Sequence, residues 1–377
     1  MYGNCVGGVT GRNYSTISYI DASGIKFVAN ENTDQKVFVG QKSIAVGGIA
    51  GINEGHISRV YSNLSAEIAS GRNYIISVGG LIGYNFGLLN LGYASGPQIK
   101  VTGDYGVYAG GLAGANNGGT ILSSVVEKGY IDCSVENHNT KITNLSNVSI
   151  VGGLVGFDGK TTNNFSITGC VSYITSLKGA FVGGLVGDAN GIIEKSHSGS
   201  QSRSVSITGF VAGGLAGIVP GKIRDCYTVC TLSGVYTDSS YDGISSIVDL
   251  KASTIGGFTA VLMNSDSEIK GCYAVVNFKD GGVRFSTCAD LSSKYTQGKV
   301  VGGIYTTEGT VGLNNFGKII STSDLNGTGD TSYQLFYKNI GSDDPSVWDV
   351  SKGGFPQLDK VDDYLPTSRV TEPVEGE

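Results

Sequence analysis

The sequence predicts an all-β fold, and within that class a β-solenoid in the form of a right-handed parallel β-helix with a C-terminal cap. Three observations carry this prediction. A Gly-Gly motif recurs along most of the chain, its copies are spaced by about 31 residues or more, and the residues between them are rich in Val, Ile, Thr, Ser and Tyr. We expect about nine coils, one for each copy of the motif.

The Gly-Gly motif is an apolar residue followed by two glycines, and it occurs nine times between Val6 and Gly303. Seven copies continue with an aliphatic residue, any residue and a further Gly, as in Ile49-Ala50-Gly51. Such glycines mark positions where only a residue without a Cβ fits, either because φ is positive or because another backbone approaches closely. We assign this structural role to Gly47, Gly48, Gly79, Gly80, Gly152, Gly153, Gly183, Gly184, Gly213 and Gly214.

The spacing of the motif indicates stacked repeats. Successive copies lie 40, 32, 31, 42, 31, 30, 43 and 46 residues apart. A period of roughly 20 to 50 residues is typical of arrays in which each unit buries its apolar face against its neighbours. Helical units are disfavoured, because each Gly in a helix interior costs about 1 kcal/mol and β-branched residues favour strands.

Alternating polarity predicts which residues face the core. Cys272, Ala274, Val276 and Phe278 form one apolar face of a strand-like stretch, and residues 60–68 and 226–232 repeat the pattern. In parallel stacked coils, equivalent residues lie ~4.8 Å apart. We therefore expect a layered core in which small residues rest on small residues.

The chain divides into three predicted parts: solenoid repeats over residues 1–320, a capping segment over 321–358 that contains the only Trp, and a linker or disordered tail over 359–377. Four units are longer than the base unit. In solenoids such insertions form loops on one flank, and we expect partner specificity there. The insertions span 21–36, 129–147, 236–254 and 280–297.

A second motif follows the first in four units, where a Gly or Glu and an aliphatic residue lead into a short residue and an aromatic one. The copies are Gly55-His56-Ile57 to Val60-Tyr61, Gly87-Leu88-Leu89 to Gly92-Tyr93, Gly221-Lys222-Ile223 to Cys226-Tyr227, and Glu268-Ile269 to Cys272-Tyr273. The combination resembles the GLUG-motif repeat proteins, which are exported bacterial adhesins and non-catalytic regions of IgA-specific metallopeptidases. The resemblance spans roughly residues 1 to 320.

This resemblance implies a non-catalytic module of an exported bacterial surface protein, located outside the cell or on its surface. It would act as an adhesive or stalk scaffold that binds a host or cell-surface glycan or protein, and further domains of a longer parent chain are expected beside it. An accessory segment of a surface metallopeptidase is an alternative within the same family.

Composition excludes several other classes. The net charge of −6 leaves no basic stripe for a phosphate backbone, so nucleic-acid binding is not expected. The sequence has no basic segment followed by an apolar run at its start, and no apolar stretch of the ~18 residues that a membrane span needs. We expect a soluble chain without membrane insertion, as an excised or mature segment of a longer protein.

Histidine and calcium motifs predict no metal site and no cofactor. His56, His138 and His197 form no His-Glu-x-x-His pair, and His56 and His197 are expected to be surface variants of repeat positions. The stretch that begins at Asp324 imitates the start of a calcium loop, but Leu335 stands where a bidentate Glu is needed. We interpret it as a turn.

The seven cysteines indicate core packing. Cys170, Cys226 and Cys272 share one repeat position, which we interpret as a buried small residue in a stack. A disulfide between Cys226 and Cys272 is an alternative, because adjacent coils are ~4.8 Å apart and this lies within the permitted Cα separation. The odd number of cysteines speaks against a disulfide-stapled scaffold.

The main rival to a binding module is a carbohydrate-active β-helix enzyme, a polysaccharide lyase or hydrolase. Hydrolytic pairs need carboxyl groups about 5 to 9.5 Å apart. Asp and Glu fall at no shared repeat position, and the candidates Asp238, Asp242 and Asp249 lie in one inserted stretch where solvated acids are expected. No catalytic residue is predicted.

One row of aromatic residues is the candidate binding surface. Tyr61, Tyr93, Tyr227 and Tyr273 share a repeat position and each follows a small residue that faces the core. Alternation then turns the row outward. Two interpretations remain open: the rings contact a glycan or protein partner, or they only shield their sheet from water or pack beneath the inserted loops.

Overall fold

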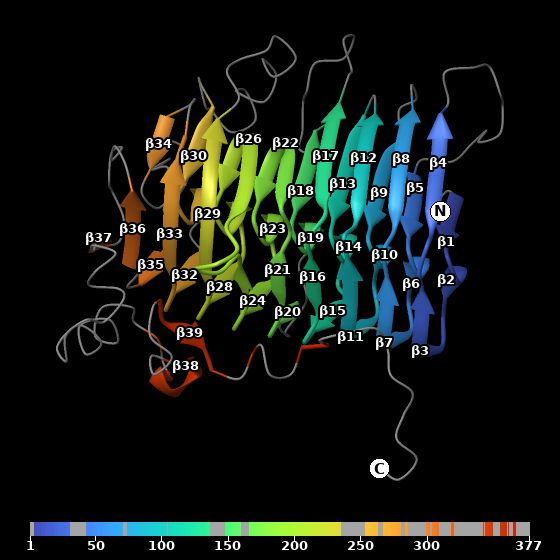
Figure 1. Ribbon diagram of the computed structural model, residues 1–377, viewed down its shortest axis with the longest axis horizontal. Coiled ribbons are helices and arrows are strands. Elements are labelled where there is room, and N and C mark those ends of the chain that lie inside the picture. The colour runs from blue at the N-terminus through green and yellow to red at the C-terminus, as the bar shows by residue number, and fades with distance from the viewer. Residues whose placement is uncertain are drawn as a thin grey trace.

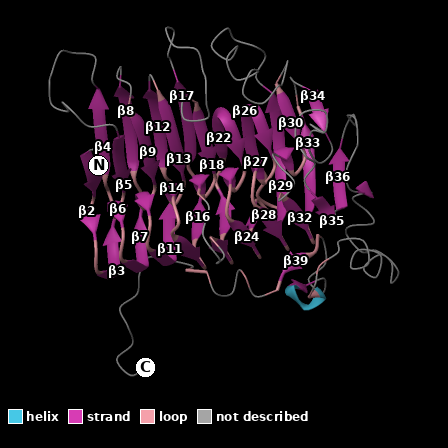
Figure 2. Ribbon diagram, turned by 180° about the vertical axis from the view of Figure 1, so that it is seen from behind, coloured by secondary structure: helices cyan, strands magenta, loops and turns pink. Residues whose placement is uncertain are grey.

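The structure is a computed structural model, and it describes residues 4–30, 43–70, 74–103, 105–135, 148–159, 166–234, 253–262, 267–279, 283–285, 299–301, 304–308, 318–319, 342, 344–349, 355–359, 361 and 365–366. These residues form an all-β fold with long parallel sheets, as predicted. Strands stack side by side along the long axis of the molecule (Figure 1). Seen from behind, the helical turn η3 (Pro345–Val347) lies apart from the strands of the main body, next to β39 (Figure 2).

The strands fall into four columns, within which each strand pairs with its equivalent in the next unit. The first column holds β1 (Asn4–Gly7), β5 (Ser43–Gly47), β9 (Ile75–Gly79), β13 (Gly106–Gly110), β18 (Ser149–Gly152), β30 (Thr254–Gly256) and β34 (Val283–Phe285). The second is a separate eight-stranded sheet of β2 (Thr10–Asn13), β6 (Ala50–Asn53), β10 (Ile82–Asn85), β14 (Ala113–Asn116), β19 (Val155–Asp158), β23 (Val186–Ala189), β27 (Ala216–Val219) and β31 (Thr259–Leu262).

The third column is the longest, and it continues into the fourth. It begins with β3 (Thr16–Ala22), β7 (His56–Ser62) and β11 (Leu88–Ser95). It continues as β15 (Thr120–Leu122), β16 (Val125–Glu127), β20 (Ile167–Thr168), β21 (Val171–Tyr173), β24 (Ile192–Glu194), β25 (His197–Ser198), β28 (Lys222–Arg224), β29 (Tyr227–Gly234), β32 (Glu268–Lys270), β33 (Tyr273–Phe278), β35 (Lys299–Val301), β36 (Ile304–Glu308) and β37 (Lys318–Ile319).

The fourth column contains β4 (Lys26–Asn30), β8 (Ser65–Ser70), β12 (Gln98–Gly103) and β17 (Tyr130–Val135). Two long strands, β22 (Ser176–Gly183) and β26 (Val205–Gly213), pass through the fourth and first columns without a break. Near the C-terminus, β38 (Trp348–Asp349) and β39 (Gln357–Leu358) form an antiparallel pair apart from these columns.

The paired glycines stand in register where backbones approach closely. The first glycine of each pair forms one row: Gly7, Gly47, Gly79, Gly110, Gly152, Gly183, Gly213 and Gly256. A Cβ on Gly184 would overlap the carbonyl oxygen of Gly214 and lie 2.5 Å from Ser198 Oγ. The glycines with positive φ lie elsewhere in the chain. Close approach, rather than backbone handedness, is therefore what these pairs satisfy.

The two residues that flank the ninth Gly-Gly pair lie in the third column, and the pair itself lies outside the described residues. Val301 pairs with Lys270, and Ile304 pairs with Tyr273. In the first column, Gly256 pairs with Phe285. The stretch after the ninth copy continues as the five-residue strand β36, which matches β33, whereas the other copies lead into the second sheet. The expected number of nine coils stays a prediction.

The predicted core alternation is confirmed. Cys272, Ala274, Val276 and Phe278 are all buried in the main hydrophobic cluster, which runs from Ala22 to Phe278. Three serine hydroxyls that face this core have no hydrogen-bond partner in the described part of the chain, those of Ser62, Ser172 and Ser198.

A bend in the third column places a whole row of residues in the left-handed region, which is strained for residues with a Cβ. The row consists of Tyr19, Arg59, Leu91, Ser123, Gly169, Lys195, Asp225 and Gly271, with φ between 42° and 65°. Only two members of this row are glycine, so the positions of the glycines in the sequence did not predict the bend.

The cysteine row explains how the bend is held. Cys226 and Cys272 are free thiols, so the alternative of a disulfide is wrong. The backbone N–H of Cys226 donates to Cys272 Sγ at 3.4 Å, and the Cys272 thiol donates to the carbonyl oxygen of Lys270 at 3.1 Å. Ser196 makes the same two kinds of contact, to Cys170 N and to Glu194 O. Both serine and cysteine occur in this row, because both are small and both side chains can donate and accept hydrogen bonds.

The insertions are shorter than the sequence indicates. Asp21 and Ala22 belong to β3, and β4 and β17 lie within the stretches expected to be loops, because their residues continue the strand alternation in register with β8 and β12. The remaining parts of the insertions fall largely outside the described residues. The same holds for Asp238, Asp242 and Asp249 and for the turn at Asp324.

Candidate functional site on the aromatic flank

The aromatic row lies in register along the third column, as predicted. Tyr61 pairs with Tyr93, and Tyr227 pairs with Tyr273. The row continues between them through Val125, Val171 and His197. These side chains lie outside the main core and form two clusters of their own.

The row points away from the main core but is buried, which agrees with the second of the two interpretations, in which the rings are covered by the chain. Tyr61 and Tyr93 are 6% and 7% exposed, and Tyr273 is fully buried. The reason is that the chain's own C-terminal segment covers the rings. Trp348 lies 5.6 Å from the Tyr273 ring, between centroids, and the Tyr273 hydroxyl donates to the carbonyl oxygen of Pro356.

The C-terminal segment contacts both clusters of the aromatic row. Leu358 packs with Tyr227 and Tyr273, whereas Leu365 packs with the distant cluster that contains Tyr61 and Tyr93. Residues 359, 361, 365 and 366 fall in the stretch expected to be a linker, yet Leu365 is only 8% exposed. Val361 and Leu365 pack against the aromatic row, and the domain boundaries expected from the sequence stay a prediction.

His197 is also buried, so the interpretation as a surface variant is wrong for this residue. It is 1% exposed, its ring stacks on Tyr227, and its Nδ1 lies 2.9 Å from the carbonyl oxygen of Gly199. His56, by contrast, is exposed as expected. The difference arises because His197 occupies the aromatic row and His56 begins β7.

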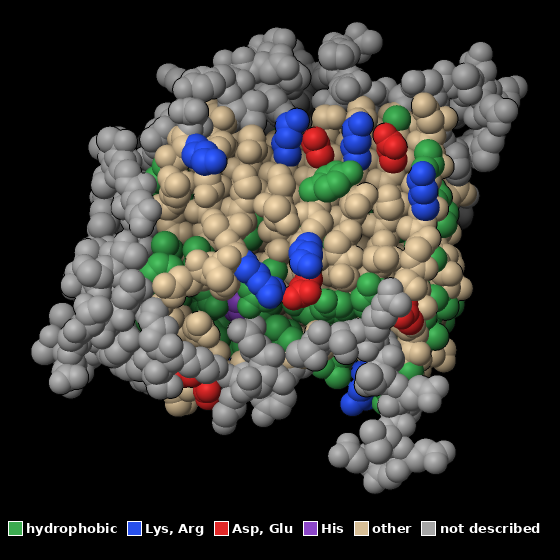
Figure 3. All heavy atoms as spheres, in the orientation of Figure 1, with side chains coloured by type: hydrophobic (Ala, Val, Ile, Leu, Met, Phe, Trp, Pro, Cys, Tyr) green, Lys and Arg blue, Asp and Glu red, His purple; other side chains and the backbone are tan. Residues whose placement is uncertain are grey.

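Beside the row, the C-terminal segment and the flank line an open cavity of about 350 Å³. Its lining comes from the aromatic row, from the ends of β16 and β21, from the turn that follows β25, and from the C-terminal segment. The residues are Tyr93, Val125, Glu127, Tyr173, Ser200, Ser202, Arg203, Tyr227, Gln357, Leu365 and Pro366. Figure 3 shows Lys or Arg side chains next to Asp or Glu beside the hydrophobic band of this face.

A charged network crosses the cavity wall. Glu127 accepts a hydrogen bond from the Tyr93 hydroxyl at 2.6 Å and from Arg203 Nη1 at 2.9 Å. The Arg203 guanidinium lies over the Tyr173 ring, 4.7 Å from its centroid. These contacts fix a planar cation and a carboxylate against aromatic rings.

The hydrogen bonds set the charge of the network. The Tyr93 hydroxyl, followed by Arg203, holds the pKa of Glu127 below its ordinary value. Burial, followed by the Glu127 hydrogen bond, raises the pKa of Tyr93 to about 12. Near neutral pH the cavity therefore presents a carboxylate, a guanidinium and a neutral phenol.

The arrangement suits binding of a polar ligand with apolar faces. Hydroxyl groups from Ser200 and Ser202, the Gln357 amide and the Arg203–Glu127 pair supply donors and acceptors, while tyrosine rings supply apolar area. Among the described residues, no group of three or more His, Cys, Asp or Glu side chains is placed to hold a metal ion. In that same part of the chain, no helix has the length and apolar content to cross a membrane.

Comparison of the chain with family models, with curated proteins and with solved structures finds no match.

Sequence reasoning missed Glu127, Tyr173 and Arg203. Glu127 and Tyr173 each lie two residues beyond the aromatic row, at paired positions of β16 and β21, so the repeat alignment could have brought them together. Arg203 lies 76 residues from Glu127 in a turn without a repeat signal, and only the fold joins the two.

A buried asparagine ladder was also missed. Each amide donates from Nδ2 to the Oδ1 of the next unit, at 2.9 Å from Asn13 to Asn53 and at 2.8 Å for each later step through Asn85 and Asn116 to Asp158. A signal existed, because each of these residues lies two positions after the third glycine of its motif. The ladder ties together the ends of the second-column strands.

Proposed function

We propose that this chain is a non-catalytic repeat module of an exported bacterial surface protein, built as a right-handed parallel β-helix of the GLUG type. The parallel register of eight glycines, from Gly7 to Gly256, supports the helical stack. A stack whose backbone bonds run from unit to unit is stiff along its length, which suits a stalk or adhesive scaffold. Neighbouring domains of a longer chain would carry it.

The binding function that the geometry supports best is recognition of a glycan in the cavity on the aromatic flank. One observation carries this proposal: Arg203 and Glu127 form an ion pair at 2.9 Å, with the guanidinium over the Tyr173 ring, in a cavity of about 350 Å³. Sugars combine hydroxyl groups with apolar C–H faces, and they are matched by bidentate polar groups next to aromatic rings.

An immobilised glycan panel tests this function. We expect the full chain to bind a restricted set of glycans, and we expect Arg203→Ala and Tyr173→Ala to lose that binding. Uniform absence of binding by the wild-type chain would contradict the proposal.

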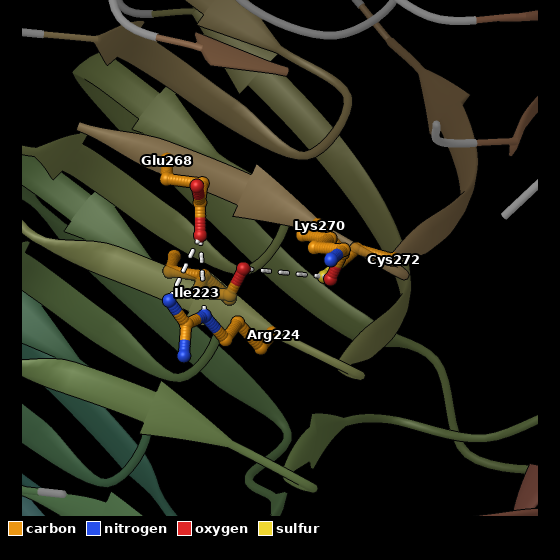
Figure 4. Close-up of polar contacts among 5 residues, drawn as sticks. All are labelled: Ile223, Arg224, Glu268, Lys270 and Cys272. Atoms are coloured by element: carbon orange, nitrogen blue, oxygen red, sulfur yellow. Dashed lines mark hydrogen bonds and ion pairs between the residues drawn. The ribbon is translucent and has the colours of Figure 1, made fainter. Parts of the chain in front are cut away.

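The matched control for this panel is Arg224→Ala. Arg224 also donates to a carboxylate, that of Glu268, at 3.1 Å, but it does not line the cavity (Figure 4). The control should bind like the wild type. Loss of glycan binding in the control would show that removing an ion pair outside the cavity also abolishes binding, which would contradict a specific role of Arg203.

The same panel separates a binding module from a polysaccharide lyase or hydrolase. Glu127 is the only carboxyl among the described residues that line the cavity, and its lowered pKa disfavours a role as general acid. We expect bound glycans to be recovered unchanged after long incubation. Release of shortened or unsaturated products would favour the enzyme.

A further inference from the structure

Within the described residues, the first unit forms an edge of both large sheets. Among the described residues, β1, β2, β3 and β4 each pair on one side only, with β5, β6, β7 and β8. In the following unit, β5 to β8 pair on both sides. Strand edges with unpaired backbone groups are sites where another strand can add.

Apolar exposure is concentrated at this edge. Of the six large hydrophobic residues that are exposed in the described part of the chain, five lie between residues 4 and 30: Val6, Val9, Tyr14, Tyr19 and Val28. Val6 is 37% exposed, whereas its partner Val46 in the next unit is 1% exposed. The larger exposed area of Val6 is surface that a further coil on this side would cover.

We propose that the open edge of β1 to β4 binds a further coil of the same Gly-Gly repeat, added in parallel register. The interface between units inside this chain continues across the edge. His56 N donates to the carbonyl oxygen of Ser15 at 2.8 Å, and Thr16 holds the position of His56 in the first unit. Thr16 N–H therefore points away from β7, toward the side on which a further coil would lie.

The asparagine ladder specifies the register of the incoming coil. Asn53 Oδ1 accepts from Gly55 N at 3.2 Å and from Asn13 Nδ2 at 2.9 Å. Asn13 Oδ1 accepts the equivalent local bond from Ser15 N at 3.1 Å. An asparagine at the same corner of the incoming coil would donate to Asn13 Oδ1 and extend the ladder by one step.

The glycines specify the sequence of the incoming coil. A Cβ on Gly48 would overlap the carbonyl oxygen of Gly80, and a Cβ on Gly8 would overlap that of Gly48. The second glycine of each pair thus gives room for the next unit. An incoming coil needs glycine at this point to approach the carbonyl oxygen of Gly8.

A labelled synthetic peptide with the sequence of residues 43–70 is the probe, because it contains one complete coil with its Gly-Gly pair and its corner asparagine. We expect saturable binding to the full chain in a fluorescence-anisotropy titration. Peptides with Gly48→Val or Asn53→Ala should bind at least about tenfold more weakly. Equal binding of all three peptides would overturn the proposal, since apolar contact alone would then explain it.

The variant Thr16→Pro tests the edge itself, because it removes an edge-facing N–H from an exposed position. We expect loss of peptide binding with an unchanged circular dichroism spectrum. Should this variant unfold, Tyr14→Lys, which places a charge at a residue 68% exposed, gives the same test. Peptide binding that survives in both variants would overturn the proposal.

Sedimentation velocity of the full chain alone distinguishes a second occupant. Association that rises with concentration, is lost in Thr16→Pro and is not accompanied by peptide binding would assign the edge to a second copy of the chain. That outcome would also overturn the proposed coil.

Discussion

His197 stacks on Tyr227 with ring centroids 4.3 Å apart and planes inclined by 9°. The stack continues to Tyr273, 5.1 Å further on and inclined by 2°, and Trp348 packs against the last two rings. The C-terminal segment thus docks along the aromatic row. The rings hold that segment in place, and the segment in turn forms one wall of the cavity.

The first prediction concerns this docking. Replacing both Tyr227 and Tyr273 with Ser should shift the emission of Trp348, the only Trp of the chain and 4% exposed, to longer wavelength, because its apolar surroundings are lost. The unfolding free energy should fall by roughly 3 kcal/mol or more. Tyr130→Ser, at a ring that is 42% exposed, is the control and should leave the emission unchanged. Unchanged emission in the double variant would show that Trp348 does not rest on this row.

The second prediction separates the two roles of glycine. Gly184→Val should destabilise the chain by much more than the ~1 kcal/mol that is typical of a point change, because its Cβ would overlap the backbone of Gly214. Gly169→Ala should cost only about 1 kcal/mol, because its φ is 63° but the nearest atom to an added Cβ is 3.8 Å away. Denaturant midpoints measure both. Equal losses of stability in the two variants would contradict the view that close backbone approach at Gly184 is more costly to disturb than the positive φ at Gly169.

The third prediction uses two neighbouring serines. Ser198→Ala should leave the free energy of unfolding unchanged or raise it, because the buried Ser198 hydroxyl has no hydrogen-bond partner within the described residues. Alanine also fits this row of positions, since Ala94 stands in the same row as Ser172 and Ser198. Ser196→Ala should cost about 1 kcal/mol or more, because Ser196 Oγ accepts from Cys170 N at 3.0 Å. Thermal melting of both variants gives the comparison. A loss at Ser198 as large as that at Ser196 would contradict it.

The fourth prediction is a pH dependence. Burial, followed by the charge of Asp158, raises the pKa of Asp188 to about 8, and burial raises the pKa of Asp158 to about 7. Unfolded Asp titrates near pH 3.9. The folded state therefore binds these protons more tightly, and the stability that they contribute is lost as the pH rises from about 4 through 8.

Asp188→Asn tests this dependence. The variant should be more stable than the wild type by at least about 1 kcal/mol at pH 8, and its stability should vary less between pH 4 and 8. Asp132→Asn removes the same charge at an exposed ion pair with Lys178 and should leave the slope as it is. A wild-type chain that gains stability over this range would contradict the assignment.

The sequence predicted the parts of the fold that depend on local pattern. The glycine row, the core face of Cys272 to Phe278 and the register of the tyrosines all follow from residues at fixed offsets in each repeat. The bend at Arg59 and Lys195 could not be predicted, because most residues of this row are not glycine. At Lys195 the next side chain, Ser196, binds both the carbonyl oxygen of Glu194 and the N–H of Cys170 in the preceding unit.

The site depended on contacts that no repeat encodes. Leu365 reaches the cluster of Tyr61 and Tyr93 across nearly the whole array, and Arg203 reaches Glu127 from a turn. Alternation predicted that the tyrosine row turns away from the core, but it left open whether the rings are exposed or covered, because alternation gives the direction of a side chain and not what covers it. Long-range docking of a non-repeating segment decides that second question.

The central claim is that the cavity between Tyr173, Arg203 and the C-terminal segment binds a glycan. Titration calorimetry with the strongest glycan of the panel tests it most directly, with the wild-type chain, Arg203→Ala and Arg224→Ala measured side by side. We expect the affinity to fall at least about tenfold in Arg203→Ala and to stay within about twofold of the wild type in Arg224→Ala. Equal affinity in all three proteins would contradict the claim.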